Sequence, residues 1–194
     1  LHIEAGKTVS FVGPTGGGKS TIAKLMCRFY DPSEGSITLD NINLKDISLQ
    51  SLHSQLGIVP QEPFLFHGTI KDNILFARPE ATDEEVVEAC KAVGIEEMIK
   101  RLPEGLETHC HERGSSLSSG ERQLLALARA FLSKPRVLIL DEATSNVDQQ
   151  NEAKIEKALD RLLEGRTAII IAHRLATTRR ADVIVVIDEQ KIIE

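Results

Sequence analysis

The sequence contains no tryptophan, a single tyrosine and few cysteines among its 194 residues. The cysteines, Cys27, Cys90 and Cys110, are widely spaced and odd in number, which predicts free thiols in a reducing, cytosolic setting and no disulfide framework. No apolar run approaches the ~20 residues that span a bilayer. The first residues lack the basic and then apolar layout of a signal peptide. The missing initiator methionine indicates an excised fragment.

The chain also lacks an excess of positive charge. Its 23 lysines and arginines against 29 aspartates and glutamates give a formal net charge of −6 at pH 7. A general nucleic-acid binder needs a basic face, so we expect no nucleic-acid partner. Hydrophobic residues make up 41% and charged residues 27%, which is typical of one soluble globular domain with a sizeable core.

Short apolar strands alternate with helical patterns along the chain, which predicts an α/β fold with a mostly parallel sheet. The segment from Gly35 to Ile42 predicts an antiparallel β arm that turns at Asp40-Asn41. The expected core strands lie at residues 8–12, 57–59, 137–140, 168–172 and 183–187.

The middle of the chain has the pattern of a helical insertion. Thr82 and Glu85 form a capping box that starts one helix, and another helix begins near Ser118. We read the segment 109–111, His-Cys-His, as ordinary loop sequence, because two closely spaced imidazoles seldom make a metal site. The expected division of the single domain, 1–194, is a core of about 1–61 and 134–194 with a helical subdomain of about 62–133.

The segment from Gly13 to Ser20 fits the pattern G-x-x-x-x-G-K-[ST]. Its glycines let several backbone N–H groups converge on phosphate oxygens, Lys19 reaches the β- and γ-phosphates, and the Ser20 hydroxyl can ligate Mg²⁺. A predicted strand precedes the loop and a predicted helix follows, whose N-terminus favours anions. The pattern predicts binding of a nucleoside triphosphate. The expected contacts in this segment are Gly13, Pro14, Thr15, Gly16, Gly17, Gly18, Lys19, Ser20 and Thr21.

Polar residues end two further predicted core strands. The apolar run 137–140 is followed by Asp141, a carboxylate placed to hold a nucleotide metal, and by Glu142, placed to polarise an attacking water. His173 follows the apolar run 169–172. Its position leaves open a structural histidine or a contact with the γ-phosphate.

The segment 117–123, Leu-Ser-Ser-Gly-Glu-Arg-Gln, resembles the signature motif LSGGQ of the ATP-binding-cassette (ABC) ATPases. Segments 64–74 and 112–114 resemble the exporter branch of that family, and the resemblance covers essentially the whole chain. Three more motifs occur in the family's order: the Q-loop at Gln61, the D-loop at 145–148, and the switch histidine at His173.

The resemblance implies a P-loop NTPase core that hydrolyses ATP with Mg²⁺ and powers export at the cytoplasmic face of a membrane. Two such domains would pair head to tail, each ATP lying between one phosphate loop and the partner's signature. A transmembrane domain would be fused upstream. The catalytic residues implied are Glu142, His173 and Gln61, and the metal ligands are Ser20, Gln61 and Asp141. The nucleotide contacts implied across the dimer are Leu117, Ser118, Ser119, Gly120, Glu121 and Asp148.

Two positions depart from the family pattern. Ser119 stands where glycine is usual, and Glu121 stands where glutamine is usual. They leave open a heterodimer with one weakened site. Two alternative functions also stay open: a soluble ABC-type ATPase that acts on nucleic acid or ribosomes, and a regulatory cassette with low turnover.

Overall fold

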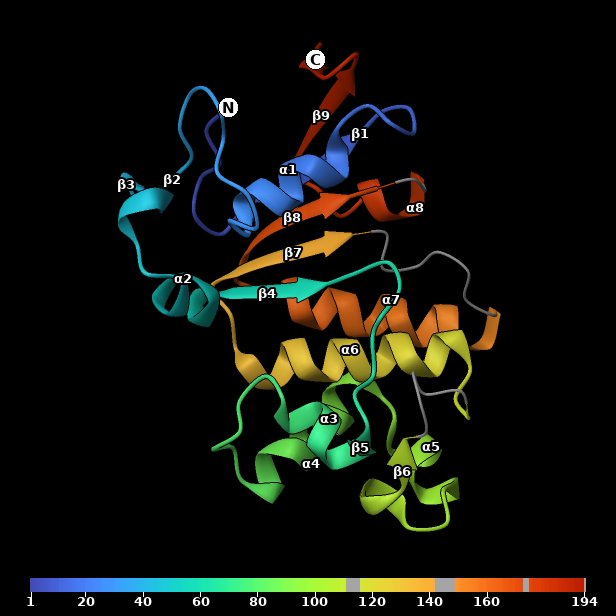
Figure 1. Ribbon diagram of the computed structural model, residues 1–194. Helices are drawn as coiled ribbons and strands as arrows, with labels where there is room; N and C mark the ends of the chain where they lie inside the picture. Colours follow the sequence, from blue (N-terminus) through green and yellow to red (C-terminus); the bar gives the residue numbers. More distant parts are fainter. Residues whose placement is uncertain (111–115, 142–148, 173–174, 194) are drawn as a thin grey trace. The chain divides into compact units, whose positions relative to one another are not determined.

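The computed structural model describes residues 1–110, 116–141, 149–172 and 175–193 (Figure 1). The chain forms two compact units: Leu1–Ile58, Pro135–Glu142 and Gly165–Glu194 make the first, and Val59–Lys134 and Ala143–Glu164 make the second. Helix α7 (Gln149–Leu163) therefore clusters with the helical unit, whereas the division expected from the sequence places residues 134–194 in the core. The reason is that α7 packs against two other helices of the second unit.

The first unit is built on a sheet that has six strands among the described residues, in the order β10-β9-β1-β8-β7-β4. Strand β1 pairs in parallel with β8 and β9, β7 pairs in parallel with β8, and β10 is antiparallel to β9. This confirms the α/β fold with a mostly parallel sheet. The elements are β1 (Thr8–Val12), α1 (Lys19–Met26), β2 (Thr38–Leu39), β3 (Ile42–Asn43), the 3-10 helix η1 (Leu44–Asp46), α2 (Leu49–Gln55), β4 (Leu56–Val59), β7 (Val137–Asp141), β8 (Thr167–Ile171), α8 (Leu175–Thr178), β9 (Val183–Asp188) and β10 (Lys191–Ile192).

The β arm predicted from the sequence is the antiparallel pair β2–β3. Its turn residues, Asp40 and Asn41, have φ angles of 48° and 65°. A two-residue hairpin turn of this kind requires positive φ at both central positions, and aspartate and asparagine tolerate it better than most residues. The predicted turn is thus confirmed.

Helix α1 packs on the sheet of the first unit through its apolar stripe. Alternate residues of a strand point to one face, so Val9 and Phe11 of β1 face the same cluster as Ala23 of α1 and Cys27, the C-cap of α1. Burial raises the pKa of the Cys27 thiol to about 11. All three cysteines are free and buried, in agreement with the sequence.

The second unit is mainly helical and confirms the predicted capping signals. Thr82 and Glu85 form the capping box of α4, and Gly94 ends that helix with a φ of 74°. The prediction of a loop at His109-Cys110 was wrong, because these residues form a short strand that pairs with β5. The elements are β5 (Gly68–Thr69), α3 (Ile70–Leu75), α4 (Asp83–Val93), α5 (Glu96–Arg101), the 3-10 helix η2 (Gly105–Glu107), β6 (His109–Cys110), α6 (Ser119–Ser133) and α7 (Gln149–Leu163).

A polar cluster joins α6 to α3 and to the segment before it. The Arg129 guanidinium donates hydrogen bonds to the Phe64 and Asn73 carbonyls, each at 2.6 Å, and to the Asn73 side-chain oxygen. Asn73, 1% exposed, donates in turn to the Phe66 and Thr69 carbonyls at 3.0 and 2.9 Å. Burial lowers the pKa of Arg129 to about 10. These side-chain bonds satisfy backbone carbonyls of the second unit.

We expect Asn73→Ala to lower the free energy of unfolding by about 2–4 kcal/mol, because it leaves buried donors and acceptors unpaired. Urea unfolding followed by circular dichroism measures the change. Gln50→Ala, at an exposed position of α2, is the control and should stay within about 0.5 kcal/mol of the wild type. An Asn73→Ala protein as stable as this control would show that the cluster contributes little.

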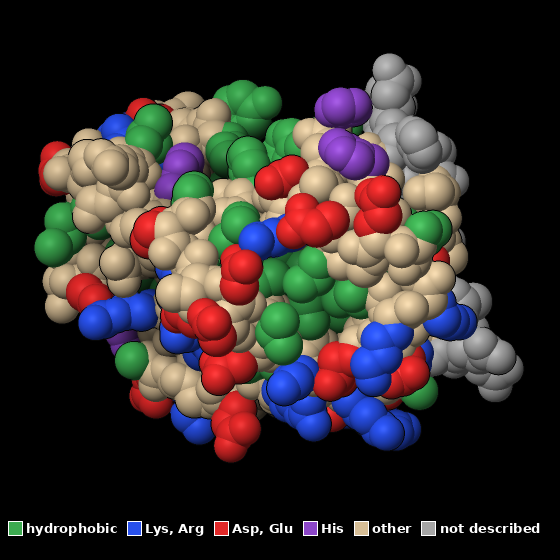
Figure 2. Space-filling view, turned by 90° about the horizontal axis from the view of Figure 1, so that it is seen from below, with side chains coloured by type: hydrophobic (Ala, Val, Ile, Leu, Met, Phe, Trp, Pro, Cys, Tyr) green, Lys and Arg blue, Asp and Glu red, His purple; other side chains and the backbone are tan. Residues whose placement is uncertain are grey.

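An ion-pair cluster surrounds Glu85 in the second unit. Its carboxylate is paired with Arg78 and, at 3.4 Å, with Lys134, and it accepts the Thr82 N–H at 3.2 Å. The hydrogen bond from Arg78, followed by that from the Thr82 N–H, lowers the pKa of Glu85 to about 2. Figure 2 shows acidic and basic side chains interspersed on the face seen from below, so oppositely charged neighbours are common there.

Glu85 should make stability depend on pH in a defined window. Its pKa is lower in the folded protein than the ordinary 4.5, so its stabilising effect is complete above about 4.5 and is lost as the pH falls toward 2. We expect Glu85→Gln to lower the melting temperature at pH 7 and to lower it by less than half as much at pH 3, partway through this window. Glu84→Gln, an exposed neighbour in the same helical turn, is the control. An equal melting-temperature loss from Glu85→Gln at both pH values would contradict the assignment.

Candidate functional site

The loop between β1 and α1 is shaped to hold an anion. The Gly17 N–H donates to the Pro14 carbonyl at 3.1 Å, which closes a tight turn. Gly18 is the N-cap of α1, with a φ of 99° and no side-chain cap. The first N–H groups of a helix lack partners within the helix, and the helix dipole favours negative charge there. The geometry therefore suits a phosphate at the N-terminus of α1.

Lys19 supplies the charge of this loop. Its side chain is 4% exposed, and its ammonium donates to the Gly13 and Pro14 carbonyls at 2.8 and 2.9 Å. The loop backbone thus curls around the ammonium, which places a cation beside the helix N-terminus. Ser20, the next residue, is exposed in the first turn of α1. An ammonium, helix N–H groups and a hydroxyl at one place are the groups that bind a magnesium-bound phosphate chain.

Close packing explains why glycine is needed at Gly13. Its φ is 145°, and a Cβ at this position would lie 1.9 Å from the Ile187 carbonyl oxygen of β9. Such a distance is far below any van der Waals contact. Gly16 differs, because its φ of 82° disfavours a side chain while the space around it is open. The loop is therefore fixed against the carboxyl end of β9 at its first residue.

Strand register brings Asp141 to the same edge of the sheet. Ile171 of β8 pairs with Phe11 of β1 on one side and with Asp141 of β7 on the other. Neighbouring strands are about 4.8 Å apart, so the Cα of Asp141 lies about 10 Å from that of Phe11. Since Phe11 comes just before the phosphate loop, the half-buried Asp141 lies at the edge from which the loop leaves the sheet. A carboxylate at this edge suits a hard divalent cation.

The signature segment forms the N-terminus of α6 in the second unit. The Ser118 hydroxyl accepts the Glu121 N–H at 3.2 Å, and the Glu121 carboxylate accepts the Ser118 N–H at 2.8 Å. Glu121, a departure from the usual glutamine, thus closes a capping box near the positive end of the helix dipole. A Cβ on the buried Gly120 would lie 2.5 Å from the Cβ of Asn151 on α7, so packing also requires this glycine.

The second unit also contains a contact that the sequence did not indicate. Gln123, buried on α6, donates to the Pro60 carbonyl at 3.4 Å. Pro60 precedes Gln61, which is exposed after β4. One signal in the sequence could have indicated this contact: Gln123 directly precedes the apolar stripe of α6. In the structure, its position is buried. The contact links the signature helix to the predicted Q-loop.

The structure brings together some of the predicted site residues. Residues 13–21 and Asp141 belong to the first unit, whereas Gln61 and residues 117–121 belong to the second. Glu142, Asp148 and His173 lie outside the described residues. Among the residues that the structure describes, no group of three or more histidine, cysteine, aspartate or glutamate side chains is arranged to hold a metal ion. In the same part of the chain, no helix has both the length and the apolar character to cross a bilayer.

The strand, the glycine-rich loop around a buried lysine, the helix and the carboxylate at the sheet edge define a P-loop nucleotide-binding domain. Residues 1–145 match the family described as "ABC transporter". Over its whole length, the chain is 55% identical to an uncharacterized ABC transporter ATP-binding protein, YknV, of Bacillus subtilis (strain 168), of which it covers 32%. The chain therefore belongs to the ABC transporter family, as an ATP-binding domain of the ATPase class.

Further relatives agree with this assignment. The whole chain is 52% identical to a putative multidrug export ATP-binding/permease protein of Staphylococcus aureus (strain NCTC 8325 / PS 47), covering 34% of it. The structure of a bacterial Atm1-family ABC exporter with ATP bound matches with a TM-score of 0.93 and 43% identity, over 100% of this chain and 34% of that chain. The chain thus spans about a third of the length of its relatives. These relatives do not support a nucleic-acid or ribosome-associated ATPase or a regulatory cassette.

The two loop glycines give a matched pair of variants. We expect Gly16→Ala to cost about 1–2 kcal/mol of stability, because only its left-handed backbone conformation opposes a side chain. Gly13→Ala should cost clearly more, because the added methyl also meets the backbone oxygen of a core strand. Chemical unfolding of both variants measures the difference. Equal losses would mean that the contact with β9 does not constrain the loop.

Proposed function

We propose that this chain hydrolyses ATP and thereby powers export by a membrane transporter of which it forms one part. The support is the match of the whole chain to the ATP-bound exporter, together with the buried Lys19 inside the phosphate loop. The two units would serve as an ATP-binding core and a helical subdomain.

The phosphate loop would bind and orient the triphosphate. Backbone N–H groups of Gly16 and of residues 18–21 would converge on the phosphate oxygens, with Gly17 lining the loop. Lys19 would exchange part of its bonding to the loop carbonyls for the β- and γ-phosphates. Because these donors are held in place before the nucleotide arrives, little reorganisation opposes binding. Gly13, Pro14 and Thr15 would form the outer wall of the loop.

Ser20, Asp141 and Gln61 would hold a magnesium ion. Ser20 offers a hydroxyl, Asp141 offers a carboxylate, and Gln61 would complete the set with an amide oxygen, all of them hard oxygen ligands. When bound, Mg²⁺ supplies charge neutralisation between the β- and γ-phosphates. Glu142, which directly follows Asp141, would accept a hydrogen bond from the attacking water and orient it. His173 would contact the γ-phosphate.

A second ABC domain would complete each site. Leu117, Ser118, Ser119, Gly120 and Glu121 would face the partner's nucleotide from the N-terminus of α6, whose dipole favours the γ-phosphate. Asp148 would link the two sites across the dimer. Because the Glu121 carboxylate is held by the Ser118 N–H, its charge is directed into its own helix cap. This bond favours a signature segment that can still bind the partner's nucleotide.

The complete protein would place this chain at the cytoplasmic face of a membrane, with a transmembrane domain fused upstream. The basis is that the Staphylococcus aureus relative combines ATP-binding and permease parts in its name, and that the chain covers a third of it. Closure of two domains around ATP and reopening after hydrolysis would then drive alternating access of the membrane part.

Two variants test the proposed activity. Glu142→Gln should keep ATP affinity but lower kcat by about 10²–10⁴-fold, because the water loses its general base. Lys19→Ala should weaken ATP binding by about 10–100-fold, since it removes charge-assisted hydrogen bonds. Calorimetric ATP titration and phosphate-release assays separate these effects.

Lys24→Ala is the matched control for Lys19→Ala, because it removes an exposed lysine from the same helix. It should leave both parameters unchanged. Full turnover by Glu142→Gln would overturn its role, and unchanged ATP binding by Lys19→Ala would overturn the proposed site.

A further inference from the structure

Two adjacent side chains of α6 hold the peptide group between Leu117 and Ser118. The N–H of this group, on Ser118, donates to the Glu121 carboxylate at 2.8 Å. Its carbonyl, on Leu117, accepts a hydrogen bond from the Arg122 guanidinium at 2.5 Å. Hydrogen bonds with one charged partner are about twice as strong as those between neutral groups. Each end of one peptide dipole is therefore paired with a side chain of the opposite charge.

The helix itself does not fix the Leu117 carbonyl. In a regular helix, the Glu121 N–H would donate to this carbonyl, four residues earlier. Here it donates to the Ser118 hydroxyl at 3.2 Å. The regular helical bonds start with the Arg122 N–H, which donates to the Ser118 carbonyl at 3.0 Å. The Arg122 side chain thus supplies the Leu117 carbonyl with the donor that the helix backbone does not provide.

The chain passes from the core to the surface at this peptide group. Leu117 is 6% exposed and belongs to the core, whereas Ser118 is exposed and Arg122 is half-buried. Because Leu117 is anchored, rotation of the peptide group would mainly move Ser118 and its hydroxyl. That hydroxyl accepts the Glu121 N–H, a bond that does not use the hydroxyl proton. The proton can therefore be donated to an oxygen from outside the chain.

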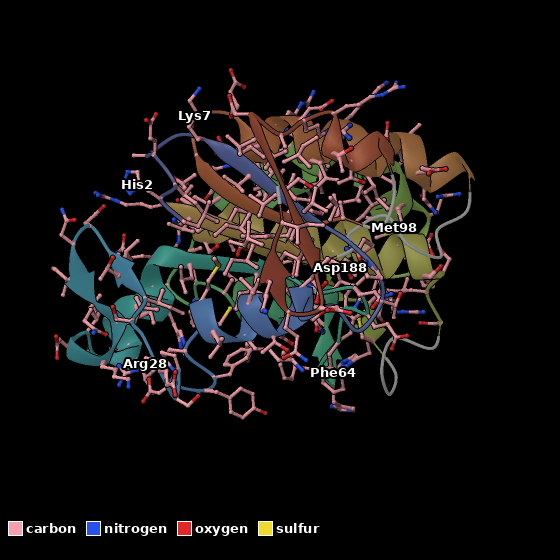
Figure 3. The ribbon with its side chains drawn as sticks, turned by 90° about the horizontal axis from the view of Figure 1, so that it is seen from above. His2, Lys7, Arg28, Phe64, Met98 and Asp188 are labelled. Atoms are coloured by element: carbon pink, nitrogen blue, oxygen red, sulfur yellow. The ribbon has the colours of Figure 1, made fainter. Side chains whose placement is uncertain are left out.

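The other arginine of α6 also binds backbone carbonyls. Arg129 donates to the carbonyls of Asn73 and of Phe64, the latter labelled in Figure 3. These bonds hold a segment that is distant in the sequence. Arg122 instead holds the residue just before its own helix, which belongs to the signature segment.

We propose that Arg122 is a positioning residue of the signature segment: its bond to the Leu117 carbonyl fixes the peptide group before α6 and so directs the Ser118 hydroxyl at the nucleotide of a partner chain. The inference rests on the proposed hydrolysis of ATP by paired chains. Arg122 acts through Leu117 and does not itself contact the nucleotide. Its effect falls on the site that its chain completes for the partner, and the phosphate loop of its own chain is unaffected.

Removal of the guanidinium tests this role. Arg122→Met keeps an unbranched apolar stem and loses the donor. Where chains pair, we expect kcat to fall by about tenfold, because small displacements of positioning groups cost large factors in rate. ATP affinity of the unpaired chain should stay within about twofold of the wild type, since the phosphate loop belongs to the first unit. Phosphate release and calorimetric titration at low protein concentration measure the two quantities.

Two further variants serve as controls. Arg122→Lys keeps a positive donor for the carbonyl, so it should retain kcat within about threefold of the wild type. Lys157→Met removes a positive charge from an exposed position of α7 in the same unit, and it should retain kcat within about twofold. Overturning results are wild-type kcat in Arg122→Met, an equal loss in either control, or a loss of single-chain ATP affinity as large as the loss in kcat.

Mixed pairs show on which chain's nucleotide Arg122 acts. Lys19→Ala has a defective phosphate loop and a normal signature, and Arg122→Met has the reverse. One site of a mixed pair joins the normal phosphate loop of one chain to the normal signature of the other. Turnover per chain in an equal mixture should therefore exceed that of either variant alone. No gain on mixing would overturn the inference, because the defect would then not be confined to the signature.

Amide hydrogen exchange without nucleotide separates this inference from the proposed function. Arg122→Met should speed exchange of the amides in residues 118–121, whereas Lys157→Met should not. Unchanged exchange in Arg122→Met would overturn the positioning role. A wild-type chain without ATP turnover, yet with this exchange difference, would overturn the proposed function and support the role of Arg122 in holding the segment.

Discussion

The buried ammonium of Lys19 is the interaction on which the candidate site depends. A desolvated cation is costly unless hydrogen bonds compensate it, and here the Gly13 and Pro14 carbonyls do so. Those carbonyls can turn inward only because the backbone at Gly13 adopts a conformation closed to other residues, pressed against β9. The Lys19 ammonium, Gly13 and the end of β9 therefore depend on one another. Together they fix the loop from which α1 begins.

Local rules made much of this fold predictable. The phosphate loop, the capping boxes at Thr82 and Ser118, and the turn at Asp40 each depend on residues a few positions apart, whose chemistry can be recognised in the sequence. The strand at 137–141 was predictable for a similar reason, because a continuous apolar run bounded by polar residues indicates a buried strand.

Long-range packing could not be predicted in the same way. The contact of Gly13 with Ile187 joins distant parts of the chain, and no local pattern marks a carbonyl oxygen as a neighbour. The pairing of His109-Cys110 with β5 is too short to produce an alternating pattern. The bonds of Arg129 to Phe64 and Asn73 likewise depend on how α6 packs. In the sequence, nothing distinguishes Arg129 from a solvent-exposed arginine on a helix.

The structure changes the meaning of one departure from the family pattern. Glu121 placed a formal negative charge in the segment expected to meet a partner's nucleotide. In the structure, its carboxylate accepts the Ser118 N–H and closes the cap of α6. The sequence left open a weakened site, and the geometry gives the carboxylate a stabilising role within its own helix.

ATP hydrolysis in a site completed by a second ABC domain requires two chains to pair. Phosphate release per chain, measured over a wide range of protein concentrations at saturating ATP and Mg²⁺, tests this requirement. Turnover per chain should rise with concentration and then level off as chains pair. A turnover per chain that stays constant down to the lowest concentration, or no turnover at any concentration, would contradict the account.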